Sequence, residues 1–125
     1  MVKTEPQIEL GKSLIELLDQ KKQEITAFLW FYLPEANSWR LVISGKSYEN
    51  KDIRECYESF IQNFGKESIV QEIGLPNITI VSNSDNLLNL LKAAVRTGSS
   101  ISGIRFTSCV VNNVLIEDAY IYRLV

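Results

Sequence analysis

The stretch "ITAFLWFYL", residues 25–33, decides the fold of this chain. It is rich in aromatic and β-branched residues, which favour strands over helices. Successive side chains of a strand point to opposite faces, and here both alternating sets are apolar. The run therefore predicts a strand that is covered on both faces, with Ala27, Leu29 and Phe31 on one side and a second apolar set on the other.

The segments on either side of this run predict its neighbours. Residues 34–38 predict a loop, because proline cannot donate to a sheet ladder and Asn and Ser favour turns. Residues 39–44 then return as the partner strand of a hairpin. Residues 7–22, before the run, carry apolar side chains at helical spacing. Gly11 lies inside that helix at a cost of about 1 kcal/mol relative to alanine, so we expect a close packing contact there.

The second half of the chain adds further helices and strands. Residues 53–64 have the clearest helical period, residues 77–82 predict a short buried strand, and residues 85–97 predict a third helix. Residues 66–73 are ambiguous and fit a short extra helix. The order α-β-β-α-β-α-β-β predicts a single α+β domain over residues 1–125, with a mixed, mostly antiparallel sheet of about five strands and three helices packed on it.

The chain closes with two strands around Asn112 and Asn113. Paired asparagines tolerate the positive φ angles of a type I′ hairpin turn, and a two-residue loop fixes the register by counting outward. A register slip by one residue would exchange the two faces, so the assignment is testable. The face expected to lie against the core carries Ile104, Phe106, Ser108, Val110, Leu115, Glu117, Ala119 and Ile121.

The other face of this hairpin is polar and is the candidate site of the chain. It consists of Arg105, Thr107, Asp118, Tyr120 and Tyr122. In one interpretation, Arg105 and Asp118 form a cross-strand ion pair and the tyrosine rings cover their neighbours. In the other, the cluster is a pocket that binds an anion or orients a substrate. We favour the structural interpretation, because ion-pair networks are common outside active sites.

Catalysis has few residue types to draw on in this sequence. There is no histidine, which removes Ser-His-Asp and Cys-His nucleophiles, histidine general bases and histidine-ligated metals. A carboxylate-dependent enzyme acting on nucleic acid remains an alternative, with Asp118 as its acid. Glu117 and Asp118 are adjacent in a strand and should point to opposite faces, so they cannot share a metal. We assign no catalytic residue, no metal and no cofactor.

Charge, hydropathy and cysteine content limit the partners and the compartment. The net charge is −2 and the 13 basic residues are scattered, whereas nucleic-acid binding needs concentrated Lys and Arg. The longest apolar run, residues 27–33, is far shorter than the roughly 20 residues of a membrane helix. Cys56 and Cys109 are isolated and the N-terminus lacks a secretory signal. We therefore expect a cytoplasmic protein that binds neither membranes nor nucleic acid.

Aromatic residues crowd the first hairpin, and core packing accounts for them better than a stacking platform for nucleic acid, which would need interleaved cations. A third interpretation makes Trp30, Tyr32 and Trp39 a candidate interface, because Trp and Tyr are enriched at protein–protein contacts. A domain of this size has little material to cover both apolar faces of residues 25–33. We therefore expect a homo-oligomer or a protein partner.

Two segments, "WRLVISG" (39–45) and "RTGSSISGIRFTSCVVNNVLIEDAYIYRLV" (96–125), resemble segments of small uncharacterised bacterial proteins. No activity, ligand or catalytic residue of that group carries over. The functional expectation therefore rests on the residues: a non-catalytic protein-interaction or regulatory module that self-associates or is a subunit of a larger complex. The alternatives are the carboxylate-dependent enzyme and a small anionic-ligand sensor that uses Arg105, Tyr120 and Tyr122.

Overall fold

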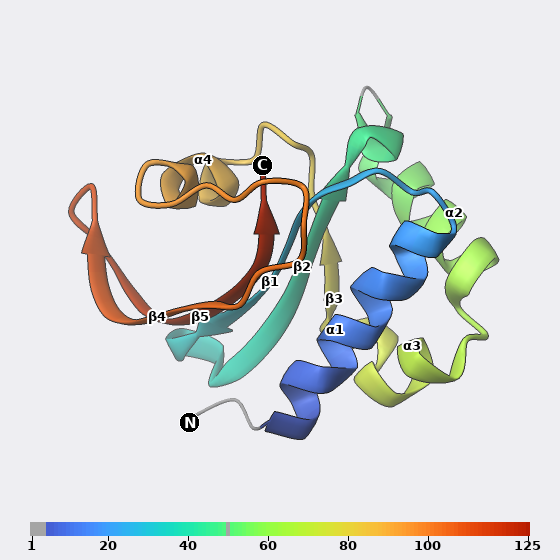
Figure 1. Cartoon of the computed structure of the whole chain (residues 1–125), viewed down its shortest axis with the longest axis horizontal. Coiled ribbons are helices and arrows are strands. Elements are labelled where there is room, and N and C mark those ends of the chain that lie inside the picture. The colour runs from blue at the N-terminus through green and yellow to red at the C-terminus, as the bar shows by residue number, and fades with distance from the viewer. Residues whose placement is uncertain (1–4, 50) are drawn as a thin grey trace.

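A mixed five-stranded sheet organises the structure, a computed structural model that describes residues 5–49 and 51–125 (Figure 1). Its strand order is β3-β2-β1-β5-β4. The strands are β1 (Ile25–Leu33), β2 (Ser38–Gly45), β3 (Ile78–Ile80), β4 (Ile104–Val111) and β5 (Val114–Leu124). The run that predicted a doubly covered strand is β1, at the centre of the sheet and antiparallel to both β2 and β5. β3 pairs parallel with β2, and β4 pairs antiparallel with β5.

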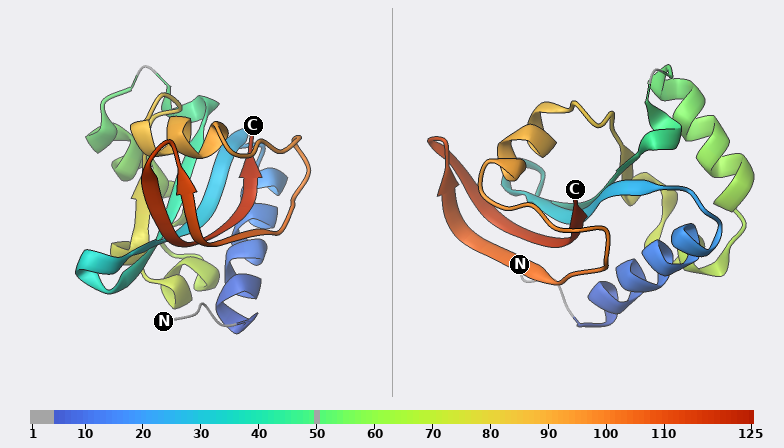
Figure 2. Two further views of the ribbon diagram at one scale, coloured as in Figure 1. Left: turned by 90° about the vertical axis from the view of Figure 1, so that its left-hand side faces the viewer. Right: turned by 45° about the horizontal axis from the view of Figure 1, so that its top comes forward.

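Helices cover the two faces of this sheet unequally, as Figures 1 and 2 show. The helices are α1 (Glu5–Gln20), α2 (Ile53–Phe64), α3 (Ser68–Ile73) and α4 (Asn86–Lys92). The first three pack on one face, whereas the short α4 and the curved β4–β5 hairpin close over the other. The predicted α+β class and element order are confirmed. The ambiguous segment 66–73 contains α3, a short helix in addition to the three that were predicted.

Helix α4 ends earlier than the predicted range 85–97. Beyond Lys92 the chain makes turns and then reaches Thr97, which is tied to the end of β5. The Thr97 N–H donates to the carbonyl oxygen of Leu124 at 2.7 Å, and the Leu124 N–H donates to Thr97 Oγ1 at 2.8 Å. In a continued helix the Thr97 N–H would donate to the carbonyl oxygen four residues earlier. The two tertiary hydrogen bonds to Leu124 are therefore incompatible with a helix that extends to residue 97.

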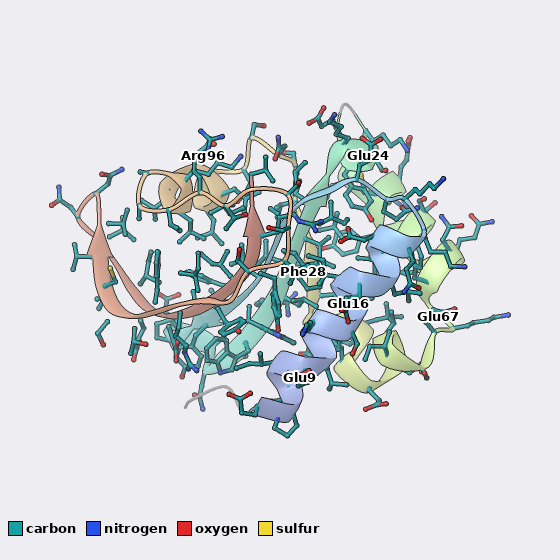
Figure 3. The ribbon with its side chains drawn as sticks, viewed as in Figure 1. Glu9, Glu16, Glu24, Phe28, Glu67 and Arg96 are labelled. Atoms are coloured by element: carbon teal, nitrogen blue, oxygen red, sulfur yellow. The ribbon has the colours of Figure 1, made fainter. Side chains whose placement is uncertain are left out.

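The side chains of β1 alternate between two apolar cores, as the sequence predicted. Phe28, Trp30 and Tyr32 pack beneath α1, α2 and α3, and Figure 3 shows Phe28 between the sheet and α1. Ala27 and Leu29 pack against α4 and the β4–β5 hairpin. Both faces of the central strand are therefore in use, which explains why neither alternating set of residues 25–33 is polar.

A β-bulge in β5 turns two consecutive side chains towards α1. The pairing of β1 with β5 shifts by one residue between Phe28 and Leu29, so that Tyr122 is an extra residue on β5. Tyr122 and Arg123, although adjacent, then both contact α1. The two Nη atoms of Arg123 donate to the carboxylate of Asp19 at 2.9 and 2.8 Å. This long-range ion pair fixes the first helix to the last strand.

Gly11 lies where α1 crosses β5. The Tyr122 hydroxyl donates to the carbonyl oxygen of Ile8 at 2.7 Å and lies directly against Gly11. A Cβ atom added to Gly11 would lie 2.8 Å from Tyr122 Cζ and 2.9 Å from Trp30 Nε1. The close packing contact that the sequence predicted at this glycine is confirmed.

The C-terminal hairpin has the predicted turn and register. Asn112 and Asn113 have φ angles of 48° and 64°, as the type I′ turn requires. The ladder pairs run from Val111 opposite Val114 to Ile104 opposite Ile121. Counting outward from the two asparagines therefore gives the observed pairing.

The two faces of this hairpin exchange partway along it. Ser108 has a φ angle of 48°, and neither Ser108 nor Glu117 takes part in a ladder pair. Nearer the sheet, Ile104, Phe106, Ala119 and Ile121 lie on the core side as predicted, but beyond Ser108 the core side is taken by Cys109, Val111 and Ile116. The prediction is therefore wrong for Ser108, Val110, Leu115 and Glu117, which are exposed. The left-handed residue reverses the alternation that strict period-two counting assumes.

Candidate functional site

The predicted polar cluster contains a bidentate ion pair. Arg105 on β4 donates from Nε and Nη2 to the two carboxylate oxygens of Asp118 on β5, at 2.9 and 2.7 Å. Asp118 is 6% exposed, and its hydrogen bond raises the pKa of the Arg105 guanidinium. Thr107, the ladder partner of Asp118, is exposed. The predicted cross-strand ion pair is confirmed, and it uses both oxygens of the carboxylate.

The two tyrosines of the cluster contact each other and lie apart from the ion pair. Tyr122 is buried, which raises the pKa of its hydroxyl, and a hydrogen bond with Trp30 opposes that increase. Its ring meets the ring of Tyr120 edge-on at 5.0 Å. Both tyrosines line a 260 Å³ hollow beside α1, together with Glu9, Lys12, and residues of the segment before β4, but neither Arg105 nor Asp118 lines it. The five predicted residues are neighbours, yet they do not form one pocket.

The acids on the chain are dispersed. Asp118 is buried and the adjacent Glu117 is exposed, so the two carboxylates are separated as predicted, although Glu117 was expected on the core side. Across residues 5–49 and 51–125, no three Asp, Glu or Cys side chains are grouped so that they could hold a metal ion. The same residues include no helix long and apolar enough to cross a membrane.

The candidate interface residues lie inside the first core. Trp30, Tyr32 and Trp39 are 3%, 7% and 8% exposed, and the Tyr32 hydroxyl donates to Oδ1 of Asn37 at 2.6 Å. Trp30 and Trp39 line a 240 Å³ hollow between α1 and α3. The helices α1 and α3 cover these three side chains, as the favoured core-packing interpretation predicted.

Exposed apolar side chains are instead concentrated at the end of the β4–β5 hairpin. Val110, Leu115 and Val114, here called the hairpin tip, are 65%, 61% and 47% exposed. Val110 and Leu115 are ladder partners, so their side chains are neighbours. The hairpin curves over the sheet face that carries α4 (Figures 1 and 2), with Val111 and Ile116 on its inner side. Sequence reasoning missed this surface because no glycine marks the left-handed Ser108 that exposes it.

A second apolar surface lies on the sheet face that α4 covers. It is a groove of 580 Å³, here called the apolar groove, lined by Phe31, Leu33, Arg40, Val42, Thr79, Val81, Asp85 and Leu87. α4 has seven residues, too few to cover this whole face. The apolar groove lies on this face at the end of β1, where Phe31 and Leu33 are half-buried.

Two charged residues border the apolar groove. Arg40 donates from Nε to Thr79 Oγ1 at 3.0 Å and from Nη1 to the carbonyl oxygen of Pro76 at 2.7 Å. Asp85 caps α4 by accepting a hydrogen bond from the Leu87 N–H at 3.0 Å. The groove is thus apolar along its floor, with one cation and one helix-capping acid at its border.

Comparison of the chain with protein-family models, curated proteins and solved structures finds no match. What the fold defines is its class, an α+β domain with a mixed five-stranded sheet. The functional argument therefore rests on the geometry of three features: the Arg105–Asp118 pair, the hairpin tip and the apolar groove.

Proposed function

We propose that this chain is a non-catalytic protein-interaction module and that the hairpin tip is its binding surface. The observation that carries the proposal is the cross-strand pair of exposed apolar side chains, Val110 and Leu115, at the end of a curved hairpin, with the exposed Val114 beside it at the turn. Burying apolar surface is favourable by about 25 cal/mol per Å². Clustered exposed apolar side chains bordered by polar residues are typical of protein-binding sites, and Asn112, Asn113 and Glu117 provide that border.

The polar cluster of Arg105 and Asp118 supports this proposal, because the two side chains bind each other and so hold β4 and β5 together. Arg105 and Asp118 satisfy each other through two hydrogen bonds, so an anion or a substrate would first have to displace a bidentate partner. No observation favours the carboxylate-dependent enzyme or the anionic-ligand sensor over the interaction module. The cluster instead stiffens the base of the hairpin whose tip is exposed.

Site-specific photo-crosslinking in the cells that make the protein tests the proposal. We expect a benzoylphenylalanine at position 110 to give a discrete crosslinked species, because that side chain would lie in the contact. The matched control places the same group at Gln62, an exposed residue of α2. Equal yields at the two positions, or no adduct at position 110, would refute the assignment of the tip as the binding surface.

A polar substitution then tests whether apolar contact holds the partner. With the crosslinker at position 114, Leu115→Ser should lower the yield of the adduct, whereas Ile61→Ser should not. Ile61 is 48% exposed on α2 and is the matched control, since both changes remove an exposed aliphatic side chain. Both residues are exposed, so neither change should alter the free energy of unfolding by more than about 0.5 kcal/mol.

A further inference from the structure

The apolar groove has room for side chains that this chain does not itself supply. Its volume is 580 Å³, and roughly 150 Å³ is enough for a benzene-sized group. The chain's own hairpin tip does not occupy it, because Val110 and Leu115 are exposed in the folded chain. The groove and the tip are therefore two apolar surfaces that remain open in the same molecule.

Glu117 beside the hairpin tip is opposite in charge to Arg40, one of the two charged residues that border the groove. Glu117 lies two residues from Leu115 on β5, roughly 7 Å along the strand, and is exposed. Arg40 is the ladder partner of Phe31, so the cation lies beside the apolar floor of the groove. In the part of the chain that the structure describes, neither Glu117 nor Arg40 belongs to an ion pair. The tip thus carries one anion, whereas the groove carries the cation Arg40 beside Phe31 and the acid Asp85 at the start of α4.

From this complementarity we infer that the apolar groove of one copy binds the hairpin tip of a second copy. Val110 and Leu115 fill the groove over Phe31, and Glu117 pairs with Arg40 at its border. The inference rests on the proposed function of the hairpin tip and names its partner. Asp85 keeps its negative charge at the start of α4, where it accepts the Leu87 N–H, so in this contact Glu117 lies on the Arg40 side of the groove and not beside Asp85.

A charge exchange tests this contact by sedimentation velocity at low salt. Glu117→Arg alone sets an arginine against Arg40, and Arg40→Glu alone sets a glutamate against Glu117, so each should weaken self-association by roughly tenfold or more. A mixture of the two variants restores opposite charges at both possible contacts and should regain association. If the mixture associates as weakly as each variant alone, and circular dichroism shows that both variants are folded, the inference is overturned.

A second measurement keeps the inference testable if Arg40→Glu fails to fold after losing its bonds to Thr79 and Pro76. A nitroxide is attached to Thr107→Cys in a Cys109→Ser background, and this protein is mixed with unlabelled ¹⁵N protein. We expect the amide signals of Phe31, Leu33 and Leu87 in the ¹⁵N copy to broaden. Broadening elsewhere, or none at concentrations high enough for sedimentation to show association in the wild type, would overturn the inference.

The two proposals fail in different ways. If the purified chain stays monomeric and shows no intermolecular broadening, a second copy is not the occupant of the groove. The crosslink from position 110 can then still identify a different protein, and the proposed function stands. If position 110 gives no adduct at all, the proposed function itself is refuted.

Discussion

Replacement of Gly11 by alanine tests the packing that joins the first helix to the last strand. The added Cβ would meet the Tyr122 hydroxyl and lie 2.8 Å from Tyr122 Cζ. Overpacking of this kind costs about 1–3 kcal/mol. Displacing the hydroxyl from the carbonyl oxygen of Ile8 costs about 1 kcal/mol more. The gain in helix propensity returns about 1 kcal/mol, so Gly11→Ala should lower the free energy of unfolding by about 1–3 kcal/mol.

Urea unfolding followed by circular dichroism measures this effect. The matched control is Gly98→Ala, because a Cβ at Gly98 meets no atom within 4 Å. That change should be neutral or stabilise by up to about 1 kcal/mol, through a less flexible unfolded chain. If Gly11→Ala stabilises the protein as much as the control does, the close approach at this helix crossing is not a feature of the protein.

A double-mutant cycle assigns the cost to Tyr122. Tyr122→Phe removes the hydroxyl that lies against Gly11 but keeps the ring. The loss caused by Gly11→Ala should therefore be smaller in the Tyr122→Phe background than in the wild type. Additive losses would show that the two residues do not interact, which would contradict the observed geometry.

Three further changes test the ion pairs and one buried hydroxyl. Asp118→Asn should lower the free energy of unfolding by about 1–3 kcal/mol, because it leaves a half-buried Arg105 without its carboxylate. It should leave partner binding intact. Lost binding at an unchanged Tm would contradict the structural role of the pair. Asp19→Asn should lower the free energy of unfolding by about 2–4 kcal/mol, because it leaves the buried Arg123 without its carboxylate partner. Urea unfolding measures this loss, and a value below about 0.5 kcal/mol would contradict the role of the ion pair. Burial raises the pKa of Tyr48 to about 12, above its unfolded value of about 10. Ionisation of this hydroxyl therefore favours the unfolded chain, and the free energy of unfolding should fall as the pH rises from about 10 to about 12. A urea series over this pH range should show a smaller decline for Tyr48→Phe, and identical declines would refute the assignment.

Local signals were sufficient to predict most of the helices and strands, but not the order of the strands in the sheet. Residues 25–33 predicted a strand covered on both faces because both alternating sets are apolar, and those sets enter the two cores that the structure shows. Asn112 and Asn113 predicted the hairpin register, because few residues other than glycine adopt the φ angles of a type I′ turn. In each case the decisive information lies within a few residues of the feature itself.

Long-range and conformational features could not be predicted in the same way. The Asp19–Arg123 pair joins residues 104 positions apart, and it depends on a bulge in β5 that no local signal marks. Ser108 adopts a left-handed conformation without being glycine or asparagine, so counting by two placed the wrong side chains at the hairpin tip in the core. The Arg105–Asp118 pair was predictable because the register alone brings the two residues together.

Sedimentation velocity over a concentration series, on the wild type and on the double variant Val110→Ser/Leu115→Ser, tests the central claim most directly. Both side chains are exposed, so the variant should keep the wild-type free energy of unfolding. We predict that the wild type forms larger species as its concentration rises, whereas the variant sediments as the 14.2 kDa monomer throughout. Indistinguishable distributions for the two proteins would contradict the claim that the hairpin tip mediates self-association.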